Sequence, residues 1–526
     1  MGRMNRTNLV GLLVVGAALG AALVGVVVQS TRSSSPPPPA PEPAPVDEVA
    51  VQEAEPAPPP PPIDVRDRQT DKPNIVMIVA CTLRMDLLTP YGGPEQASPF
   101  VAQMAADGTR FANAIDAAPW TKAASTALMT GHHPIQVGMT EPKNHANRRR
   151  LSSEVTTLAE YLDQAGYETI GLTANPNTNE LFGFSQGFDH YVEPQGLWGK
   201  GKVHKPSTKK LAESLLPRLD TREDPDAPLY LRLMVTDVHE PIHTTARKMK
   251  PFQGLTQYPR RVREYLSMVR QLDMGIEYVW TELGKRGYTA DNTILLLVND
   301  HGEGLKWPAK HGHGHGNHVQ ASTVRMPWVI MGEGVASDHV VQGMASQVDV
   351  LPTLLGLAGI EADYAGPGRD WSAQVRGESD RTDRVASYAD TWFQRSSRAG
   401  VYTEDLACLH DFLDLAEKLG QERINPRTAC YDRRNDPMQV EPLGENEALV
   451  AQLKDWRHDR EADNAAWAHH EDIRVPDDVE AQLEALGYVQ GDEELGDEPA
   501  HVEKPRRGKG KGKGKERKGK GKGKGR

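Results

Sequence analysis

An apolar run near the middle of the chain places the strongest constraint on the fold. It covers residues 293–298, Thr-Ile-Leu-Leu-Leu-Val, and is followed directly by Asn299, Asp300, His301, Gly302 and Glu303. A run of this length between polar and glycine residues is typical of a strand buried on both faces, as in parallel sheets covered by helices. In such sheets the ligand site lies at the carboxyl ends of the strands. The run therefore predicts an α/β fold with ionisable side chains at a strand end.

The two ionisable residues after this strand are candidate cation ligands. Asp300 supplies a carboxylate and His301 an imidazole nitrogen, and neighbouring residues can both reach one ion. The alternative is a solvated turn after a core strand, which is the more common role of a lone Asp-His pair. A run of histidines and glycines from His311 to His318 follows closely and favours the metal site.

Three other segments carry reactive side chains at strand ends or at a helix start. Cys81 ends an apolar run, and His239 follows the predicted strand Leu229–Thr236. Thr121 precedes a run of small residues, Lys122–Met129, that predicts a helix. A hydroxyl at a helix start lies in a positive field that also holds anionic esters, although capping the helix is a common role of threonine. Because the carboxyl ends of strands converge in such sheets, we expect these segments to meet in one crevice.

Alternating helix and strand patterns predict how the chain is divided. We expect a catalytic domain over residues 73–372, with a largely parallel central sheet between helices, and a smaller C-terminal α+β subdomain over residues 373–490. Residues 31–72 are predicted to be a Pro-rich linker, and residues 491–526 a disordered Gly/Lys-rich tail. At 526 residues the chain is long enough for more than one core.

The N-terminal segment predicts the location of the protein. Residues 9–28 contain only Gly, Ala, Val and Leu, and Arg3 and Arg6 precede them. A helix of that length spans about 30 Å, the thickness of a bilayer core. We expect residues 1–30 to be a membrane anchor of a single-pass protein whose catalytic domain lies outside the cell membrane, in a periplasmic or extracellular space. A cleaved signal peptide is the alternative.

Charge and cysteine content exclude several classes of protein. Residues 503–526 carry 13 Lys and Arg against 2 Glu, so the net charge of -11 combines +11 on this tail with -22 on the other 502 residues. The acidic body argues against specific nucleic-acid recognition, whereas the tail is able to bind polyanions. The three cysteines, Cys81, Cys408 and Cys430, form neither a disulfide framework nor a CxxC zinc pattern, although the last two can pair in an oxidising compartment.

A series of motifs between Pro73 and about Val489 resembles the sulfatase family of the alkaline-phosphatase-like superfamily. The motifs are Pro73-Asn74-Ile75-Val76 with Thr82–Asp86, Ala118–Thr121 with Leu128–Gly131, Phe182–Phe184 with Gln186–Asp189, Asp300–Glu303 with Gly314–Asn317 and Met326-Pro327, Val348–Gly359, Tyr431-Asp432 with Asn435–Pro437, and Leu486–Val489. The resemblance implies an alkaline-phosphatase-like fold and a metal-bound site for sulfate or phosphate esters.

The resemblance also implies a role for each candidate residue. By position, Asp300 and His301 would be metal ligands, and Thr121 would be the nucleophile and a further ligand. His239 and His315 would hold oxygens of the ester or of its leaving group. His315 is chosen over its neighbours because only its Gly-His-Gly-Asn keeps the family's spacing to the following Met-Pro.

The chain departs from the family at the nucleophile. Many sulfatases convert the first residue of a Cys/Ser-x-Pro-Ser-Arg motif to formylglycine, whereas this chain has Thr121–Ser125, and threonine cannot give that aldehyde. Threonine at this place instead resembles phosphoryl-transferring relatives, such as lipoteichoic-acid synthases and phosphoethanolamine transferases. The family's sulfate-holding Lys-x-His pair has no counterpart around Asn175–Asn177. Lys122 either supplies the missing positive charge or is a solvated lysine.

A second departure concerns the metal. Cys81 stands where the family's first strand ends in a metal-binding Asp, and a thiolate favours Zn over Ca, Mg or Mn. Cys81, Asp300 and His301 with one open position would form a catalytic zinc site. The alternative is an inert buried thiol in a protein that has lost its metal site.

These inferences predict a metal-dependent hydrolase or transferase. Its substrates would be sulfate or phosphate esters of glycans or lipids, its cofactor one divalent metal ion, and Thr121 its nucleophile. The alternative is a catalytically inactive sulfatase-like protein that binds anionic polymers.

Overall fold

The computed structural model describes residues 71–140, 149–194, 206–222, 224–308, 313–393, 396–412, 428–464 and 473–486. The predicted anchor, the predicted tail and all of the predicted linker except Asp71 and Lys72 lie outside these ranges. Within them, no helix combines the length and the apolar character needed to cross a membrane.

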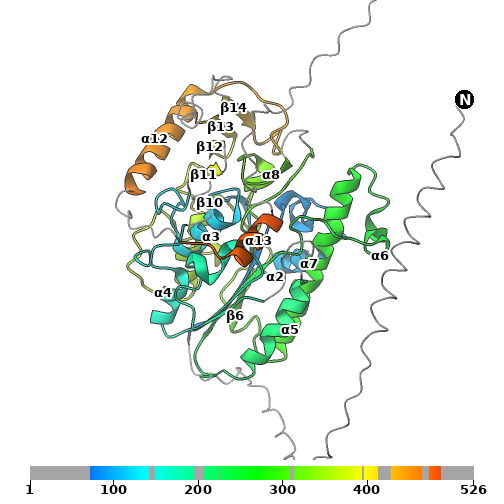
Figure 1. The fold of residues 1–526 in the computed structure, drawn as a ribbon, viewed down its shortest axis with the longest axis vertical. Coiled ribbons are helices and arrows are strands. Elements are labelled where there is room, and N and C mark those ends of the chain that lie inside the picture. The colour runs from blue at the N-terminus through cyan, green and yellow to red at the C-terminus, as the bar shows by residue number, and fades with distance from the viewer. Residues whose placement is uncertain are drawn as a thin grey trace, which may run out of the picture. The chain divides into compact units, whose positions relative to one another are not determined.

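An eight-stranded sheet forms the centre of the larger part of the described chain (Figure 1). β9 runs antiparallel to its neighbours β2 and β6, and the other neighbouring strands are parallel. The predicted α/β fold with a largely parallel central sheet is therefore confirmed. The strands follow the spatial order β10 (His339–Ser346), β2 (Thr109–Ile115), β9 (Trp328–Gly332), β6 (Thr293–Asn299), β1 (Asn74–Ala80), β5 (Leu229–Val235), β3 (Glu168–Thr173) and β4 (His190–Val192).

Helices cover both faces of this sheet. Every residue of β1, β5 and β6 is buried, because successive side chains point alternately into two apolar cores. On one face the core is closed by α2 (Pro99–Asp107), α5 (Thr208–Leu219) and α7 (Arg260–Gly284). On the other face it is closed by α3 (Thr121–Thr130), α4 (Leu158–Gln164) and α9 (Val350–Leu357).

The register of the central strands aligns their carboxyl ends. Ala80 at the end of β1 pairs with Asn299 at the end of β6 and with Val235 at the end of β5. The residues that follow these strands therefore emerge at the same edge of the sheet. Short elements complete this part of the chain: η3 (Met85–Leu87), η4 (Thr89–Tyr91), η5 (Pro176–Thr178), η6 (Glu180–Phe182), α6 (Ala246–Met249), η7 (Lys250–Phe252), β7 (Gly304–Leu305), β8 (His313–Gly314), α8 (Ala321–Val324), η8 (Gln347–Asp349) and α10 (Ser372–Val375).

A second sheet follows in the chain. It is antiparallel and four-stranded, and α12 (Glu447–Asn464) packs on it through Val450 and Leu453. Cys408 and Cys430 lie opposite each other on neighbouring strands and form a disulfide. The strands of this second sheet are β11 (Ser387–Phe393), β12 (Ser396–Tyr402), β13 (Leu406–Asp411) and β14 (Thr428–Asp432). The last described helix of the chain is α13 (Asp477–Ala485).

The second sheet supports two loops of the first. Gly316 donates a backbone hydrogen bond of 2.8 Å to Pro119, and its carbonyl accepts one of 2.5 Å from the Thr391 hydroxyl. Gly316 has a φ of +87°, and an added Cβ would lie 2.7 Å from the Phe393 ring, so only glycine fits. The same ring lies 5.4 Å from that of Trp120. Strand β11 thus holds the loops that precede Thr121 and follow His315.

Candidate active site

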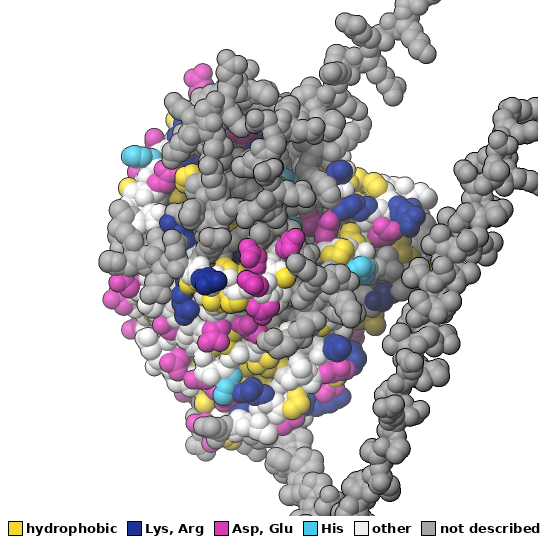
Figure 2. Space-filling view, in the orientation of Figure 1, with side chains coloured by type: hydrophobic (Ala, Val, Ile, Leu, Met, Phe, Trp, Pro, Cys, Tyr) yellow, Lys and Arg dark blue, Asp and Glu magenta, His cyan; other side chains and the backbone are white. Residues whose placement is uncertain are grey.

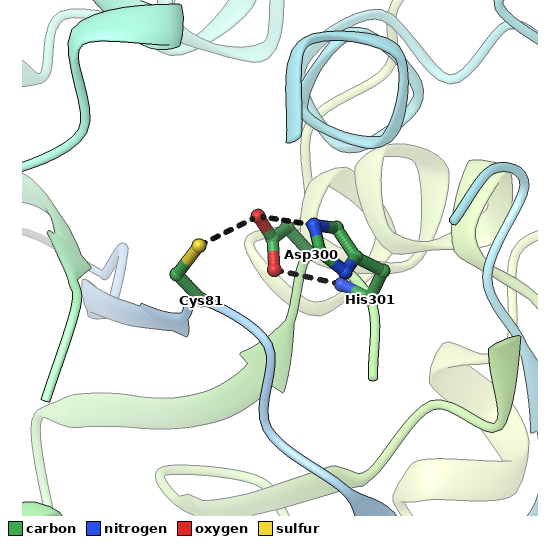
Figure 3. A group of neighbouring side chains, drawn as sticks. All are labelled: Cys81, Asp300 and His301. Atoms are coloured by element: carbon green, nitrogen blue, oxygen red, sulfur yellow. Dashed lines mark hydrogen bonds and ion pairs between the residues drawn. The ribbon is translucent and has the colours of Figure 1, made fainter. Parts of the chain in front are cut away.

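Three potential metal ligands meet at the ends of β1 and β6 (Figure 3). The Asp300 carboxylate accepts hydrogen bonds from the backbone N–H groups of Thr82 at 2.9 Å and His301 at 2.7 Å, which fixes its orientation. Its Oδ2 lies 3.2 Å from Cys81 Sγ and 3.4 Å from His301 Nε2. Cys81, Asp300 and His301 are all fully buried. The structure therefore brings the three predicted ligands together.

Burial determines the protonation of this cluster. Burial, and then the charge of Asp300, raises the pKa of the Cys81 thiol well above its usual value, so the thiol donates to Asp300. Burial lowers the pKa of His301 and favours its neutral form. Its Nδ1 lies 2.8 Å from the carbonyl of Gly302, which can only accept, so Nδ1 carries the hydrogen. The lone pair of Nε2 is then directed into the cluster.

Thr121 lies against this cluster. Its Oγ1 is 3.3 Å from His301 Nε2 and 3.7 Å from Cys81 Sγ, and the residue is fully buried. Thr121 is the first residue of α3, and Trp120 occupies the N-cap, so the interpretation of Thr121 as a mere helix cap is wrong. A hydroxyl in the first turn of a helix lies in the positive field of its free N–H groups. The predicted nucleophile is thus placed beside the predicted ligands.

Asn175 is a fourth member of the cluster that the sequence analysis missed. Its amide nitrogen donates to Cys81 Sγ at 3.3 Å and to Thr121 Oγ1 at 3.4 Å. Two residues later, Asn177 is fully buried, yet in the described part of the chain neither end of its amide has a hydrogen-bond partner. The signal was the position of Asn175 just after strand β3, the same strand-end rule that identified the other residues.

Two histidines and a glutamate extend the site. The ring of His315 lies 4.6 Å from that of His301 and 5.2 Å from that of His239. His315 Nδ1 is 3.2 Å from Glu303 Oε2, and Glu303 is fully buried. Burial alone would disfavour the charged forms of both side chains. Their mutual attraction and hydrogen bond are stronger than this effect, so the pKa of His315 is raised and that of Glu303 is lowered to about 2. The buried carboxylate of Glu303 therefore favours the protonated form of His315.

Lys122 points toward an aromatic ring. Its Nζ lies 3.4 Å from the ring centroid of Phe182, and the residue is fully buried. Burial lowers its pKa well below the usual value. Lys122 is therefore not a solvated lysine, and the structure gives it an aromatic contact. The histidines of the His/Gly run before residue 313 lie outside the described residues.

The donor set fits a divalent metal. A tetrahedral zinc ion with bonds of about 2.0–2.3 Å separates its ligand atoms by about 3.3–3.5 Å. Four of the six separations among Cys81 Sγ, Asp300 Oδ2, His301 Nε2 and Thr121 Oγ1 are 3.2, 3.4, 3.3 and 3.7 Å, and the ligand atoms of Cys81, Asp300 and His301 all lie within 4.8 Å of one another. The buried thiol proton is the group that a cation would displace, because a metal-bound thiol is deprotonated. The residues present therefore fit a small, partly soft cation.

Comparisons with known proteins identify the family of the chain. The family model described as Sulfatase matches residues 73–360. An arylsulfatase of Hemicentrotus pulcherrimus is 23% identical over 334 residues, which is 55% of this chain and 58% of that protein. The N-acetylgalactosamine-6-sulfatase of Homo sapiens is 25% identical over 334 residues, 55% of this chain and 62% of that protein. The chain thus spans about three fifths of the length of these curated relatives.

Solved structures share the fold. The crystal structure of Ps i-CgsB in complex with k-i-k-neocarrahexaose aligns with a TM-score of 0.60 and 19% identity over 79% of this chain and 98% of that one. The structure of a 2-O GAG sulfatase aligns with a TM-score of 0.59 and 18% identity over 78% of this chain and 96% of that one. The family model covers more than half of the chain, and the chain therefore belongs to the sulfatase family of the alkaline-phosphatase-like superfamily.

Proposed function

We propose that this protein hydrolyses sulfate esters, with the Thr121 hydroxyl as nucleophile and a divalent metal held by Cys81, Asp300 and His301. One observation carries the proposal: Thr121 Oγ1 lies 3.3 Å from His301 Nε2, next to the three candidate ligands. The relatives named above are sulfatases, which supports sulfate as the group transferred. The disulfide between Cys408 and Cys430 supports a location outside the cytoplasm.

Neighbouring groups favour the alkoxide form of Thr121. Asn175 donates to Thr121 Oγ1 at 3.4 Å, and such a donor stabilises the negative charge of an alkoxide. A bound cation would lower the pKa of the Thr121 hydroxyl and neutralise charge on the ester oxygens. The thiol donor favours zinc for this role.

Three residues act on the other side of the ester. With the cation bound, the Thr121 hydroxyl would lose its proton to solvent; in the first step its oxygen then forms a bond to sulfur while the bond between sulfur and the leaving oxygen breaks. His315 in its protonated form, which Glu303 favours, donates its proton to that leaving oxygen, and Glu303 holds the ring in place at 3.2 Å. His239, whose ring lies 5.2 Å from that of His315, binds the ester beside it.

The second step releases the product. Water attacks the sulfuryl group on Thr121, the bond between sulfur and the Thr121 oxygen breaks, and His315 recovers a proton from the attacking water. Sulfate leaves, and the threonine oxygen is free for another cycle. The same groups accept a phosphate ester without rearrangement, because both esters carry anionic oxygens around a tetrahedral centre. A comparison of the turnover of an aryl sulfate with that of an aryl phosphate therefore decides between the two esters.

Substitution of Thr121 tests the proposal. Thr121→Val keeps the shape and removes the hydroxyl, so we expect turnover of a small aryl sulfate to fall at least about 1,000-fold. The matched control Thr121→Ser keeps the hydroxyl and should retain turnover within about tenfold. A label carried on the sulfuryl group should be trapped on wild-type protein and not on the valine variant.

Three results would overturn parts of the proposal. Full turnover by Thr121→Val would exclude Thr121 as the nucleophile. Faster turnover of the aryl phosphate than of the aryl sulfate would replace sulfate by phosphate. An absence of turnover with zinc, calcium, magnesium or manganese would favour the catalytically inactive, polyanion-binding protein.

A further inference from the structure

A cationic stretch follows His239 and Glu240 in the chain. Between Glu240 and Glu264 the chain carries six Lys and Arg and no Asp or Glu. This stretch forms α6, η7 and the first turn of α7 and is called the cationic ridge below. Figure 2 shows Lys and Arg side chains around this region, at the right of the view where Figure 1 labels α6. The six residues are Arg247, Lys248, Lys250, Arg260, Arg261 and Arg263.

The charges on α6 and η7 are not compensated. Arg247, Lys248 and Lys250 are exposed, and no carboxylate among the described residues lies within ion-pair distance of them. By contrast, Arg260 pairs with Glu264 and Arg261 pairs with Glu240. Three cations without an ion pair thus lie within four residues, on a chain whose net charge outside its basic tail is -22. Like charges this close repel one another unless an anion binds them.

The backbone of the ridge is anchored to the core and to its neighbouring helix. Phe252 is fully buried in the core beneath η7. The hydroxyls of Thr244 and Ser267 lie 2.6 Å apart, and Thr245 caps α6 by accepting from the N–H of Lys248. Because the backbone is anchored, binding an anion orders only the side chains and loses less entropy than ordering a loop.

One residue connects the ridge to the active site. Glu240 accepts a hydrogen bond of 2.6 Å from His239 Nδ1 through its carbonyl, while its carboxylate pairs with Arg261. His239 faces His315 across 5.2 Å between ring centroids. Arg261 of the ridge thus pairs with the residue that directly follows His239.

We propose that the cationic ridge binds further anionic groups of a sulfated polysaccharide whose cleaved ester lies at Thr121. The assignment of the cleaved ester rests on the proposed function, whereas the ridge itself is inferred from its own charge and exposure. A polymer with repeated sulfate groups supplies one anion to the catalytic cluster and others to Arg247, Lys248 and Lys250. Exposed polar side chains between the cations, such as Gln253 and Gln257, match sugar hydroxyls.

The surface fits a polysaccharide better than a lipid bilayer. The large exposed apolar side chains of the described chain are Met274, Val385, Val440 and Leu443, and none belongs to the ridge. Helix α6 has only four residues, too few for the apolar face of a membrane-surface helix. The ridge therefore offers charge and hydrogen bonds but nothing to insert into a membrane.

Local protection from chemical modification tests the ridge in the full chain. Lysines are acetylated with and without an iota-carrageenan-type sulfated polysaccharide, and each site is quantified by mass spectrometry. We expect protection of Lys248 and Lys250 and none of Lys285, which lies at the far end of α7. This readout needs no turnover, so it reports on the ridge even if the proposed function fails.

Variants give a second, quantitative test. Arg247→Gln, Lys248→Gln and Lys250→Gln together should weaken polysaccharide binding about tenfold and reduce its salt dependence by a slope of about 2. The ratio of kcat/KM for the polymer to that for a small aryl sulfate should fall to a similar extent. The matched control removes three exposed cations elsewhere, Arg218→Gln, Lys285→Gln and Arg381→Gln, and should leave binding unchanged. The basic tail is the same in every variant.

Each outcome either supports or overturns the proposed binding of the polysaccharide to the ridge. Protection confined to Lys248 and Lys250, together with a loss seen only in the ridge variant, supports the proposal. Equal losses in the ridge and control variants would show a general charge effect and overturn it. Binding of the ridge to anionic vesicles, without protection by the polysaccharide, would replace the polysaccharide by a membrane surface.

Discussion

Replacement of Asp300 by asparagine should weaken metal binding without destabilising the metal-free fold. The carboxylate accepts from two backbone N–H groups, those of Thr82 and His301, at 2.9 and 2.7 Å. An asparagine keeps one oxygen for these donors. Its NH₂ group then occupies the place of Oδ2, 3.4 Å from His301 Nε2, whose lone pair accepts a hydrogen bond. We therefore expect Asp300→Asn to change the free energy of unfolding without metal by no more than about 1 kcal/mol.

The substitution should instead reduce the stabilisation that a bound metal ion gives to the folded state. An ion present at 1,000 times its Kd stabilises the folded state by about 4 kcal/mol. The change removes a charged ligand atom, which should cost more than the 10–100-fold lost with groups that merely support a ligand. If Kd rises about 1,000-fold, the stabilisation falls to about 0.4 kcal/mol. At roughly 2 °C per kcal/mol, the zinc-induced rise in Tm should fall from about 8 °C to about 1 °C.

The assay is thermal unfolding of the full chain, titrated with zinc, calcium or magnesium, combined with elemental analysis of bound metal. Asp291→Asn, an exposed residue at the opposite end of β6, is the matched control and should behave as wild type. Equal metal content and an equal metal-induced rise in Tm for Asp300→Asn would refute Asp300 as a ligand. A large loss of stability without metal would refute the reasoning from hydrogen bonds.

Three further predictions concern the thiol, the disulfide and a buried acid. Cys81→Asp replaces a soft donor by a hard one and should raise calcium or magnesium affinity, and unchanged titration curves would place the thiol outside the metal site. Replacing Cys408 and Cys430 by serine opens a link across 22 residues and should cost about 3 kcal/mol in denaturant unfolding; an unchanged midpoint would contradict this. Burial raises the pKa of Asp390 from 3.8 to about 6. The folded state therefore holds this proton more tightly, and stability should fall by about 3 kcal/mol as pH rises from about 4 to above 6, a slope that Asp390→Asn should remove.

The sequence pattern predicted the central strand and the residues after it for a physical reason. A strand buried on both faces has no solvent-facing side to interrupt its apolar run, so β6 and the adjacent Asp300 and His301 stand out. The direction of β9 did not follow from the same logic. Its five residues are apolar in either orientation, and its antiparallel pairing with β2 and β6 depends on the path of the chain around it.

Two parts of the site escaped sequence reasoning. Asn175 follows strand β3, but it carries no charge and asparagine after a strand is commonly a turn residue, so its position alone did not separate it from a turn residue, whereas its contacts with Cys81 and Thr121 do. The cationic ridge lies on α6 and η7, which are too short to give a hydrophobic period. Its meaning depends on which charges lack partners, and that is a property of the folded surface.

The support that β11 gives to the loop at Gly316 has a consequence for synthesis of the protein on the ribosome. A nascent chain that ends at residue 372 already contains Cys81, Thr121, Asp300 and His315, but it lacks Thr391 and Phe393, which hold Gly316. The loop that carries His315 would then be secured only after β11 has emerged and docked. A chain that stops before β11 would thus carry all the reactive groups without the strand that supports the loop of His315.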